Sequence, residues 1–207
     1  MDRVSQSESS IGILGGSFDP IHNGHLYLAE QALCAKKLDR VLFLPALNPP
    51  HKNSSCLTDK EHRINMIRCA ISGSERMEID ETEIRRGGVS YTVDTVRALS
   101  KSWPGARLFF IIGSDSLREL HTWRSIREIV MAVTFIVLSR TPDEQPAPDP
   151  ELEKRLHNTP LRSMILPVKP FPVSSTEIRN SIRTGKPLRN QIPERVMQYI
   201  EKHGLYR

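Results

Sequence analysis

The sequence predicts an α/β protein built on a doubly wound parallel sheet, and two observations support this fold class. Short apolar runs alternate along the chain with longer segments whose apolar residues recur at helical spacing. Such alternation is typical of a parallel sheet that is covered by helices on both faces. In addition, the apolar runs at 11–14 and 108–112 are followed directly by glycine, as expected where a buried strand ends in a tight turn.

The elements of the first half follow from local signals. We expect strands at three segments: Ile11–Leu14, Val41–Leu44 and Glu78–Ile84. One helix is expected after the first strand, and two more begin near Thr58 and Thr92. Thr58 starts a Thr-x-x-Glu capping box, and Thr92 fits the N-cap of a helix whose apolar residues recur at helical spacing. The proline-rich segment 46–57 is expected to be a loop.

The second half repeats the pattern. We expect strands at Leu108–Ile112, Thr134–Leu138 and Met164–Leu166, with a short helical region around 125–131. The proline-rich segment 141–150 is expected to be a surface connection. A helix should follow the capping box that starts at Ser174 and end near Gly185, and a last helix should run from Pro193 to Gly204.

Length and composition predict one domain and exclude several classes of protein. The chain has 207 residues, which favours a single domain over 11–207 after a flexible tail at 1–10, with a small helical part at about 174–207. No apolar run is long enough for a membrane span, and the first ten residues do not resemble a secretory signal. The 3 cysteines show no CxxC spacing, so we expect neither a disulfide framework nor a zinc module, and we expect a cytoplasmic protein.

The formal net charge of +5 does not identify a partner by itself. A basic surface is compatible with nucleic acid or with anionic small molecules such as nucleotides. The chain has no run of five or more Lys and Arg, and its aromatic residues are not interleaved with basic ones. These features disfavour an RNA-binding platform, but charge alone leaves the class of partner open.

The segment after the first predicted strand has the chemistry of a phosphate site. It reads GGSFDPIHNGH from Gly15 to His25. The two glycines allow the backbone to approach a ligand closely, and the helix that follows offers unpaired N–H groups to a phosphate. His22 and His25 are three residues apart at the helix start, so both rings can face the same side and donate hydrogen bonds to developing negative charge.

Other interpretations of this segment remain open. Taken singly, each histidine is better explained as a helix cap or a half-buried side chain. A metal pair is disfavoured, because zinc-binding histidines on a helix prefer a spacing of four residues and need further ligands. The absence of GxGxxG and of GxxxxGK[ST] disfavours a dinucleotide-dependent dehydrogenase and a P-loop ATPase.

Two separate motifs carry a resemblance to a known family. Gly15–His25 resembles the GG[ST]FDPxHxGH signature of the HxGH nucleotidyltransferase superfamily, and VSSTEIR at Val173–Arg179 resembles its second signature, [IV]SST-x-[IL]R. Within this superfamily the chain is most similar to the bacterial nicotinate mononucleotide adenylyltransferases. The segments that carry this similarity are LPALNPPHK at 44–52, SYTVDT at 90–95, FIIGSDSL at 110–117 and the Thr-Trp pair at 122–123. The resemblance covers 11–207 except for the proline-rich segment 141–150.

The resemblance implies a Rossmann-like nucleotidyltransferase fold and a specific reaction. The 5′-phosphate of nicotinate mononucleotide would attack the α-phosphorus of ATP, giving nicotinate adenine dinucleotide and pyrophosphate, a step in NAD biosynthesis. ATP is then the co-substrate and nicotinate mononucleotide the second small-molecule partner. Neither a nucleic acid nor a membrane is expected as a partner, and the oligomeric state is not predicted. Mg²⁺ is expected to arrive on the triphosphate, because the sequence has no dense carboxylate cluster and no metal ligands are predicted.

The same resemblance assigns roles to individual residues. His22, His25 and Arg179 are expected to be catalytic. The positions expected to bind ATP are Gly15, Gly16, Ser17, Phe18, Gly113, Asp115, Ser174, Ser175 and Thr176. The positions expected to bind the acceptor are Lys52, Tyr91, Thr92 and Trp123. We also expect the charge of Arg124 to favour an acid over an amide substrate.

Structural explanations compete with several of these roles. Ser174 and Glu177 also form a plain capping box, and Asp115 also fits a helix N-cap. Trp123 also fits core packing, and Lys52 a solvated loop. Two alternative functions are weighed as well: another HxGH adenylyltransferase that uses nicotinamide mononucleotide or phosphopantetheine, and a non-catalytic module that binds nucleotides or RNA.

Overall fold

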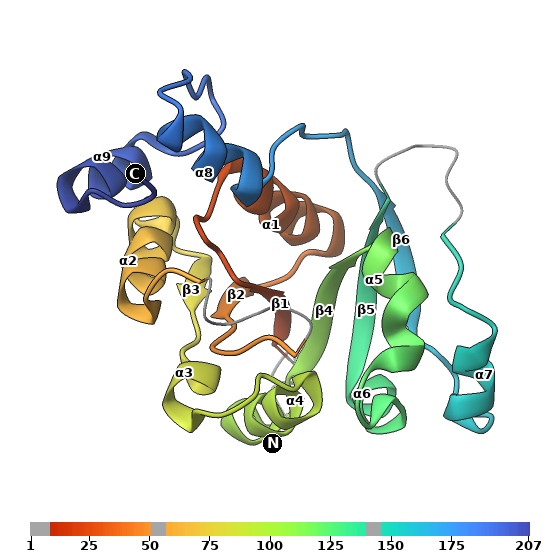
Figure 1. The fold of residues 1–207 in the computed structure, drawn as a ribbon. Helices are drawn as coiled ribbons and strands as arrows, with labels where there is room; N and C mark the ends of the chain where they lie inside the picture. The colour runs from red at the N-terminus through yellow and green to blue at the C-terminus, as the bar shows by residue number, and fades with distance from the viewer. Residues whose placement is uncertain (1–8, 51–56, 140–145) are drawn as a thin grey trace.

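The structure is a computed structural model that describes residues 9–50, 57–139 and 146–207. Six parallel strands form one sheet in the order β3-β2-β1-β4-β5-β6, shown in Figure 1. The strands are β1 (Ser10–Gly16), β2 (Arg40–Pro45), β3 (Met77–Ile79), β4 (Arg107–Gly113), β5 (Val133–Ser139) and β6 (Ser163–Pro167). The predicted fold class, an α/β protein with a doubly wound parallel sheet, is confirmed.

Helices connect the strands. Between β1 and β4 lie α1 (Asn23–Lys36), α2 (Lys60–Ile71), α3 (Thr82–Arg86) and α4 (Thr92–Ser102). Between β4 and β6 lie α5 (Ser114–Glu119), the 3₁₀ helix η2 (Leu120–Thr122), α6 (Ile126–Ala132) and α7 (Glu151–Leu156). After β6 come α8 (Ser175–Arg183) and α9 (Glu194–His203), which confirm the two helices predicted near the end of the chain. None of the helices in the described ranges is long and apolar enough to span a membrane.

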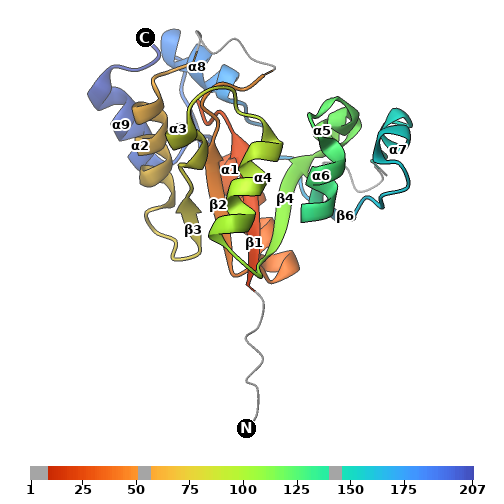
Figure 2. The same cartoon turned by 90° about the horizontal axis from the view of Figure 1, so that it is seen from below.

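Successive strand residues alternate between two cores, one on each face of the sheet. In β2, Val41 and Phe43 belong to the core that includes residues of α1, α2, α8 and α9, whereas Leu42 and Leu44 belong to the core that includes residues of α4, α6 and α7. Accordingly, α1 and α4 lie on opposite sides of the sheet in Figure 1, and Figure 2 shows the same layers from below. Because both faces are buried, the strands are continuous apolar runs, which is why they could be recognised in the sequence.

Three predicted boundaries are wrong, each for a local reason. The predicted strand at Glu78–Ile84 is a strand only up to Ile79, because the Asp80 carboxylate then accepts a hydrogen bond from the Thr82 N–H (2.7 Å) and α3 begins. Asp59 rather than Thr58 caps α2, by accepting from the Glu61 N–H at 2.8 Å. The N-cap position of α4 is Tyr91, and Thr92 is its first helical residue.

Other differences are smaller. Strand β1 begins at Ser10, which the sequence analysis assigned to the tail, and its hydroxyl accepts a hydrogen bond from the Arg107 guanidinium at 2.8 Å. The short helices α5 and α7 were not predicted. Helix α9 ends at Gly204, which adopts the left-handed conformation (φ 60°) expected of a terminating glycine.

Candidate active site

The loops predicted to bind ATP follow the carboxyl ends of β1 and β4. These two strands are adjacent in the sheet, and the next strand after β1 lies on one side of the pair while the next strand after β4 lies on the other. Ligands of doubly wound sheets bind in the crevice at this position. The reactive loop, defined here as residues 17–22, connects β1 to α1 and bears the first signature. Gly113 ends β4 and is the N-cap residue of α5. Helix α8, with the second signature, lies near the start of α1 in Figure 1.

The reactive loop folds back on the glycine that precedes it. A Cβ atom at Gly16 would lie 3.1 Å from the Phe18 ring, so the closeness of this ring favours glycine here. Phe18 is 1% exposed and adopts a left-handed conformation (φ 48°), which is uncommon for a bulky residue. Its ring contacts His25 edge-on, with centroids 5.0 Å apart, and Phe43 at 5.7 Å. The buried aromatic ring thereby supports one of the two signature histidines.

The two signature histidines are stacked at the start of α1. Their ring centroids are 3.7 Å apart and the planes differ by 22°. The backbone N–H of His22 donates to Nδ1 of His25 at 3.2 Å. Because Nδ1 of His25 accepts this bond, a neutral His25 ring carries its proton on Nε2 and can donate it to a ligand. A Cβ atom at Gly24 would lie 2.8 Å from Val173 and 3.1 Å from Nδ1 of His22, so the glycine leaves room for both side chains.

His22 is held in its neutral form by burial. Its side chain is 7% exposed, and burial lowers its pKa to about 4, against the weaker opposite effect of a hydrogen bond with its own backbone. Within the described ranges, its buried Nδ1 atom has no hydrogen-bond partner. The ring instead faces the start of α1, where the His22 side chain and the His25 backbone have the arrangement of a capping box.

The burial of His22 predicts a pH dependence of stability. Because its pKa is lower in the folded than in the unfolded chain, the unfolded state binds the proton more readily, and stability falls as the pH drops from 6.5 towards 4. The cost from this group is about 2 kcal/mol between pH 7 and pH 5. Urea unfolding of the wild type and of His22→Gln at both pH values measures it. Equal losses of unfolding free energy in the two proteins would contradict the assignment.

The second signature is docked against the first. Ser174 caps α8 by accepting from the Glu177 N–H at 3.2 Å, and the Ser175 hydroxyl donates to the carbonyl oxygen of Pro20 at 2.9 Å. The guanidinium of Arg179 donates to the carbonyl oxygen of Asp19 at 2.6 Å and to the Thr176 hydroxyl at 3.3 Å. The loop that leads to His22 is therefore held by the first two turns of α8.

Asp115 lies at the edge of this arrangement. It is in the first turn of α5 rather than at its N-cap, and its side chain is 69% exposed and ion-paired with Arg118. The alternative interpretation of Asp115 as an N-cap is therefore wrong. The carboxylate is exposed near the end of β4, so a ligand can reach it. Binding would replace only the ion pair with Arg118, and a surface ion pair contributes little to stability.

The predicted acceptor residues form a second group, around the start of α4. The buried Ser90 hydroxyl accepts hydrogen bonds from the N–H groups of Leu47 (2.9 Å) and Asn48 (3.2 Å), so it holds the segment after β2 beside Tyr91 and Thr92. Ser90 belongs to the SYTVDT motif but was not among the predicted site residues. Lys52 lies outside the described residues.

Two further side chains stand near this group. Trp123 is half-buried and packs edge-on against Phe110 and Phe135, with centroids 5.8 and 6.3 Å apart, so the core-packing interpretation of this residue is confirmed. Arg124 places its guanidinium 4.7 Å from the centroid of the Tyr91 ring. This cation–π contact brings the loop after η2 to the start of α4.

Three polar residues around the reactive loop were not among the predicted site residues: Asp19, Arg63 and Tyr206. Asp19 is 1% exposed, and its carboxylate accepts from the Thr58 N–H and from the Tyr206 hydroxyl. Arg63 is 2% exposed and donates to the carbonyl oxygens of Ser17 and Thr58, among others. An available signal was the position of Arg63 on the apolar face of its helix.

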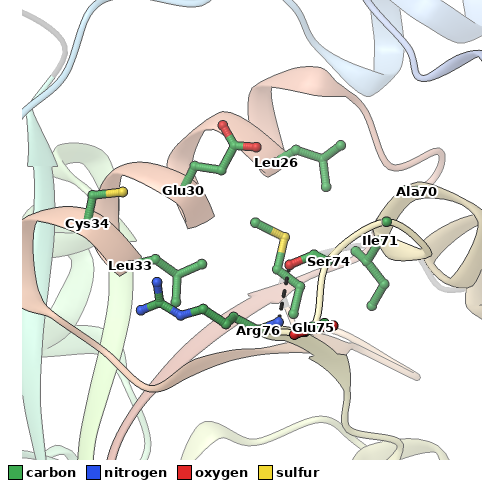
Figure 3. A pocket seen from close by; sticks show the side chains of 11 residues that line it. Leu26, Glu30, Leu33, Cys34, Ala70, Ile71, Ser74, Glu75 and Arg76 are labelled. Atoms are coloured by element: carbon green, nitrogen blue, oxygen red, sulfur yellow. Dashed lines mark hydrogen bonds between the residues drawn. The ribbon is translucent and has the colours of Figure 1, made fainter.

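A groove on the surface lies apart from this site. It has a volume of about 540 Å³ and lies between α1 and the turn at 73–76 that leads from α2 into β3, as Figure 3 shows. Leu26, Glu30, Leu33 and Cys34 line one side of it. None of the predicted site residues lines this groove. No group of three or more His, Cys, Asp or Glu suited to a metal ion occurs within 9–50, 57–139 and 146–207.

Comparison with known proteins places the chain in a family. A family model described as "Cytidylyltransferase-like" matches residues 13–181. The chain is 39% identical to a probable nicotinate-nucleotide adenylyltransferase of Clostridium tetani, with 94% of this chain and 98% of the relative covered. It is also 39% identical to the nicotinate-nucleotide adenylyltransferase of Bacillus subtilis, with 95% and 97% covered.

Solved structures show the same fold. The nicotinic acid mononucleotide adenylyltransferase of Plasmodium falciparum, solved in complex with NaAD, superposes with a TM-score of 0.76 at 21% identity, covering 96% of this chain and 98% of that one. The same enzyme in complex with APC gives a TM-score of 0.74. The chain is thus a nucleotidyltransferase of the cytidylyltransferase-like class. Within that class it belongs to the nicotinate-nucleotide adenylyltransferase family.

Proposed function

We propose that this chain transfers the adenylyl group of ATP to the 5′-phosphate of nicotinate mononucleotide, giving nicotinate adenine dinucleotide and pyrophosphate. Membership of the family supports the reaction, and the geometry supports the assignment of residues. The observation that carries most weight is the docking of the two signatures. The Arg179 guanidinium and the Ser175 hydroxyl donate to the carbonyl oxygens of Asp19 and Pro20. These two residues belong to the loop that leads to the stacked pair His22 and His25.

The reaction requires positioning and charge stabilisation more than proton transfer. The attacking phosphate is already an anion, so an in-line displacement at the α-phosphorus needs no general base. The Nε2–H of His25 and the ring of His22 would donate to the oxygens of the triphosphate, where negative charge grows in the transition state. Arg179, together with the hydroxyls and N–H groups at the start of α8, would hold the pyrophosphate that leaves.

The remaining predicted residues divide between the two substrates. Gly15, Gly16, Ser17 and Phe18 would line the triphosphate, and Gly113 with Asp115 the adenosine. On the acceptor side, Tyr91, Thr92 and Trp123 would form the pyridine pocket and Lys52 would meet the phosphate. Because the described residues offer no cluster of carboxylates, Mg²⁺ would enter bound to ATP. We place the reaction in the cytoplasm, where the free thiols of Cys34 and Cys69 would stay reduced.

An acceptor comparison tests this function. Pyrophosphate release from ATP is measured with nicotinate mononucleotide, its amide or phosphopantetheine as acceptor. We expect kcat/KM to be highest for the acid, by about 10-fold or more over the amide, since an acid-binding site gains a charged hydrogen bond. Arg124→Ala should lower the ratio of acid to amide, because the guanidinium beside Tyr91 adds positive charge near the expected pocket.

The outcomes separate the alternatives. A preference for phosphopantetheine or for the amide would replace the proposed acceptor while keeping the adenylyl transfer. Absence of pyrophosphate release with every acceptor, combined with salt-dependent RNA binding, would favour a non-catalytic module. An unchanged ratio of acid to amide in Arg124→Ala would remove Arg124 from acceptor selection and leave the reaction itself standing.

A further inference from the structure

Asp19, in the middle of the reactive loop, is held by groups from three distant parts of the chain. Its Oδ1 atom accepts from the Tyr206 hydroxyl at 2.6 Å, and its Oδ2 atom accepts from the Thr58 N–H at 3.2 Å. Its carbonyl oxygen accepts from the Arg179 guanidinium at 2.6 Å. A buried carboxylate needs such partners, because a bare charge is costly away from water. The position of the reactive loop therefore depends on all three contacts.

Tyr206 reaches Asp19 from beyond the end of α9, 187 residues along the chain. It is one of the non-glycine residues with a left-handed backbone (φ 65°), a conformation that costs energy for a bulky side chain. Burial raises the pKa of its hydroxyl, and the hydrogen bond to Asp19 raises it further. The hydroxyl consequently stays protonated and donates to the carboxylate. Strained backbone that persists in this way is typical of functional sites.

The contact between Tyr206 and Asp19 adjoins two expected catalytic groups. On one side, the carbonyl oxygen of Asp19 orients the guanidinium of Arg179. On the other side, Phe18 is the chain neighbour of Asp19, and its ring packs edge-on against His25. Phe18 also has a left-handed backbone, so the loop has little freedom to shift without moving this ring. A displacement of Asp19 would therefore disturb both the ring contact of His25 and the hydrogen bond of Arg179.

We propose that Tyr206 is a positioning residue of the active site. By donating to Asp19, its hydroxyl sets the geometry of the loop that carries His22 and the position of Arg179 on α8. Docking of the segment 204–207 would then be coupled to occupation of the ATP site. This inference rests on the proposed function. It extends that function to a part of the chain that lies outside both signatures.

Tyr206→Phe tests the role of the hydroxyl while it keeps the ring. Because a misplacement of about 1 Å can cost 100-fold in rate, we expect kcat to fall by about 10- to 100-fold. The KM for nicotinate mononucleotide should change by less than about threefold, since the acceptor group around Ser90 is not in this network. The matched control is Tyr199→Phe, which removes hydroxyl contacts with His62 (3.0 Å) and Asn65 (3.2 Å) between α2 and α9.

Comparison of the two variants separates positioning from general stability. Thermal unfolding of both is measured first, and Tyr199→Phe should retain kcat within about twofold of the wild type. Equal kcat values for Tyr206→Phe and the wild type would overturn the proposal. So would equal losses of kcat in the two variants, because the effect would then follow the weakening of the helical part rather than the bond to Asp19.

A second measurement uses the wild type and needs no turnover. A non-hydrolysable ATP analogue is added, and backbone amide exchange is followed in 17–25 and in 204–207. Coupling is reciprocal, so ligand that orders the loop should also slow exchange in 204–207. Protection of 17–25 with unchanged exchange in 204–207 would overturn the proposal even if Tyr206→Phe failed to fold. Failure of the wild type to bind the analogue would instead overturn the proposed function on which the inference rests.

Discussion

Replacement of His25 by alanine should lower kcat by about 100- to 1000-fold, the loss typical of removing one preorganised donor to developing charge. The donor is fixed from two sides. The His22 N–H donates to Nδ1 of His25, which places the ring proton of a neutral imidazole on Nε2, and the Phe18 ring packs edge-on against the imidazole. Steady-state pyrophosphate release with saturating ATP and nicotinate mononucleotide measures the effect.

A histidine outside the site provides the control. The ring of His121 lies 3.0 Å from the Arg118 carbonyl oxygen on the exposed surface, and His121→Ala should keep kcat within about twofold. Binding of the ATP analogue to His25→Ala, measured by calorimetry, should be weakened less than kcat, because the donor acts most strongly on charge that develops in the transition state. A His25→Ala enzyme with kcat within about threefold of the wild type would refute the donor role.

The strands could be predicted because a strand that is buried on both faces is a continuous apolar run in the sequence. Leu108–Ile112 is continuous apolar sequence, and the structure places it within β4, next to β1. The segment 78–84 was predicted to be a strand throughout, but β3 ends at Ile79, and Ile84 is the single apolar residue of the segment beyond that point. The Asp80 carboxylate decides the outcome there by starting a new helix, and a single side-chain hydrogen bond of this kind is poorly encoded in periodicity.

The parts of the site that were predictable are those encoded by short spacing. His22 and His25 lie in one turn of α1, and Ser174 and Arg179 lie in the first turns of α8. The partnership of Asp19 with Tyr206 could not be predicted, because it joins side chains 187 residues apart and depends on how α9 packs. Thr58 illustrates the same limit.

Thr58 has the sequence of a helix cap, but tertiary contacts use its backbone instead. Its N–H donates to Asp19 and its carbonyl oxygen accepts from Arg63, and Asp59 caps the helix in its place. Local propensity was overruled by a buried polar network. Such networks can be worth more than local preferences, because each unpartnered member would be costly.

Replacement of Arg63 by methionine should lower the free energy of unfolding by about 3–5 kcal/mol, a large share of the stability of a typical domain. Its guanidinium donates to carbonyl oxygens from three segments: Ser17 (2.8 Å), Ala46 (2.8 Å) and Thr58 (3.0 Å). Burial lowers the pKa of Arg63, and the charge of Asp19 opposes that shift most strongly. Methionine fills similar space but leaves three carbonyl oxygens without their donor and removes the positive charge that interacts with the buried Asp19 carboxylate.

Urea unfolding of Arg63→Met and Arg68→Met makes the comparison within one helix. Arg68 forms an ion pair with Glu81 at 2.7 Å, but its side chain is 56% exposed, so its loss should cost less than about 1 kcal/mol. Similar losses in the two variants would show that the buried contacts of Arg63 contribute no more than a surface pair. A large loss confined to Arg63→Met would mean that the reactive loop and α2 are stabilised as one unit. In that case the geometry around His22 depends on a residue that lies outside both signatures.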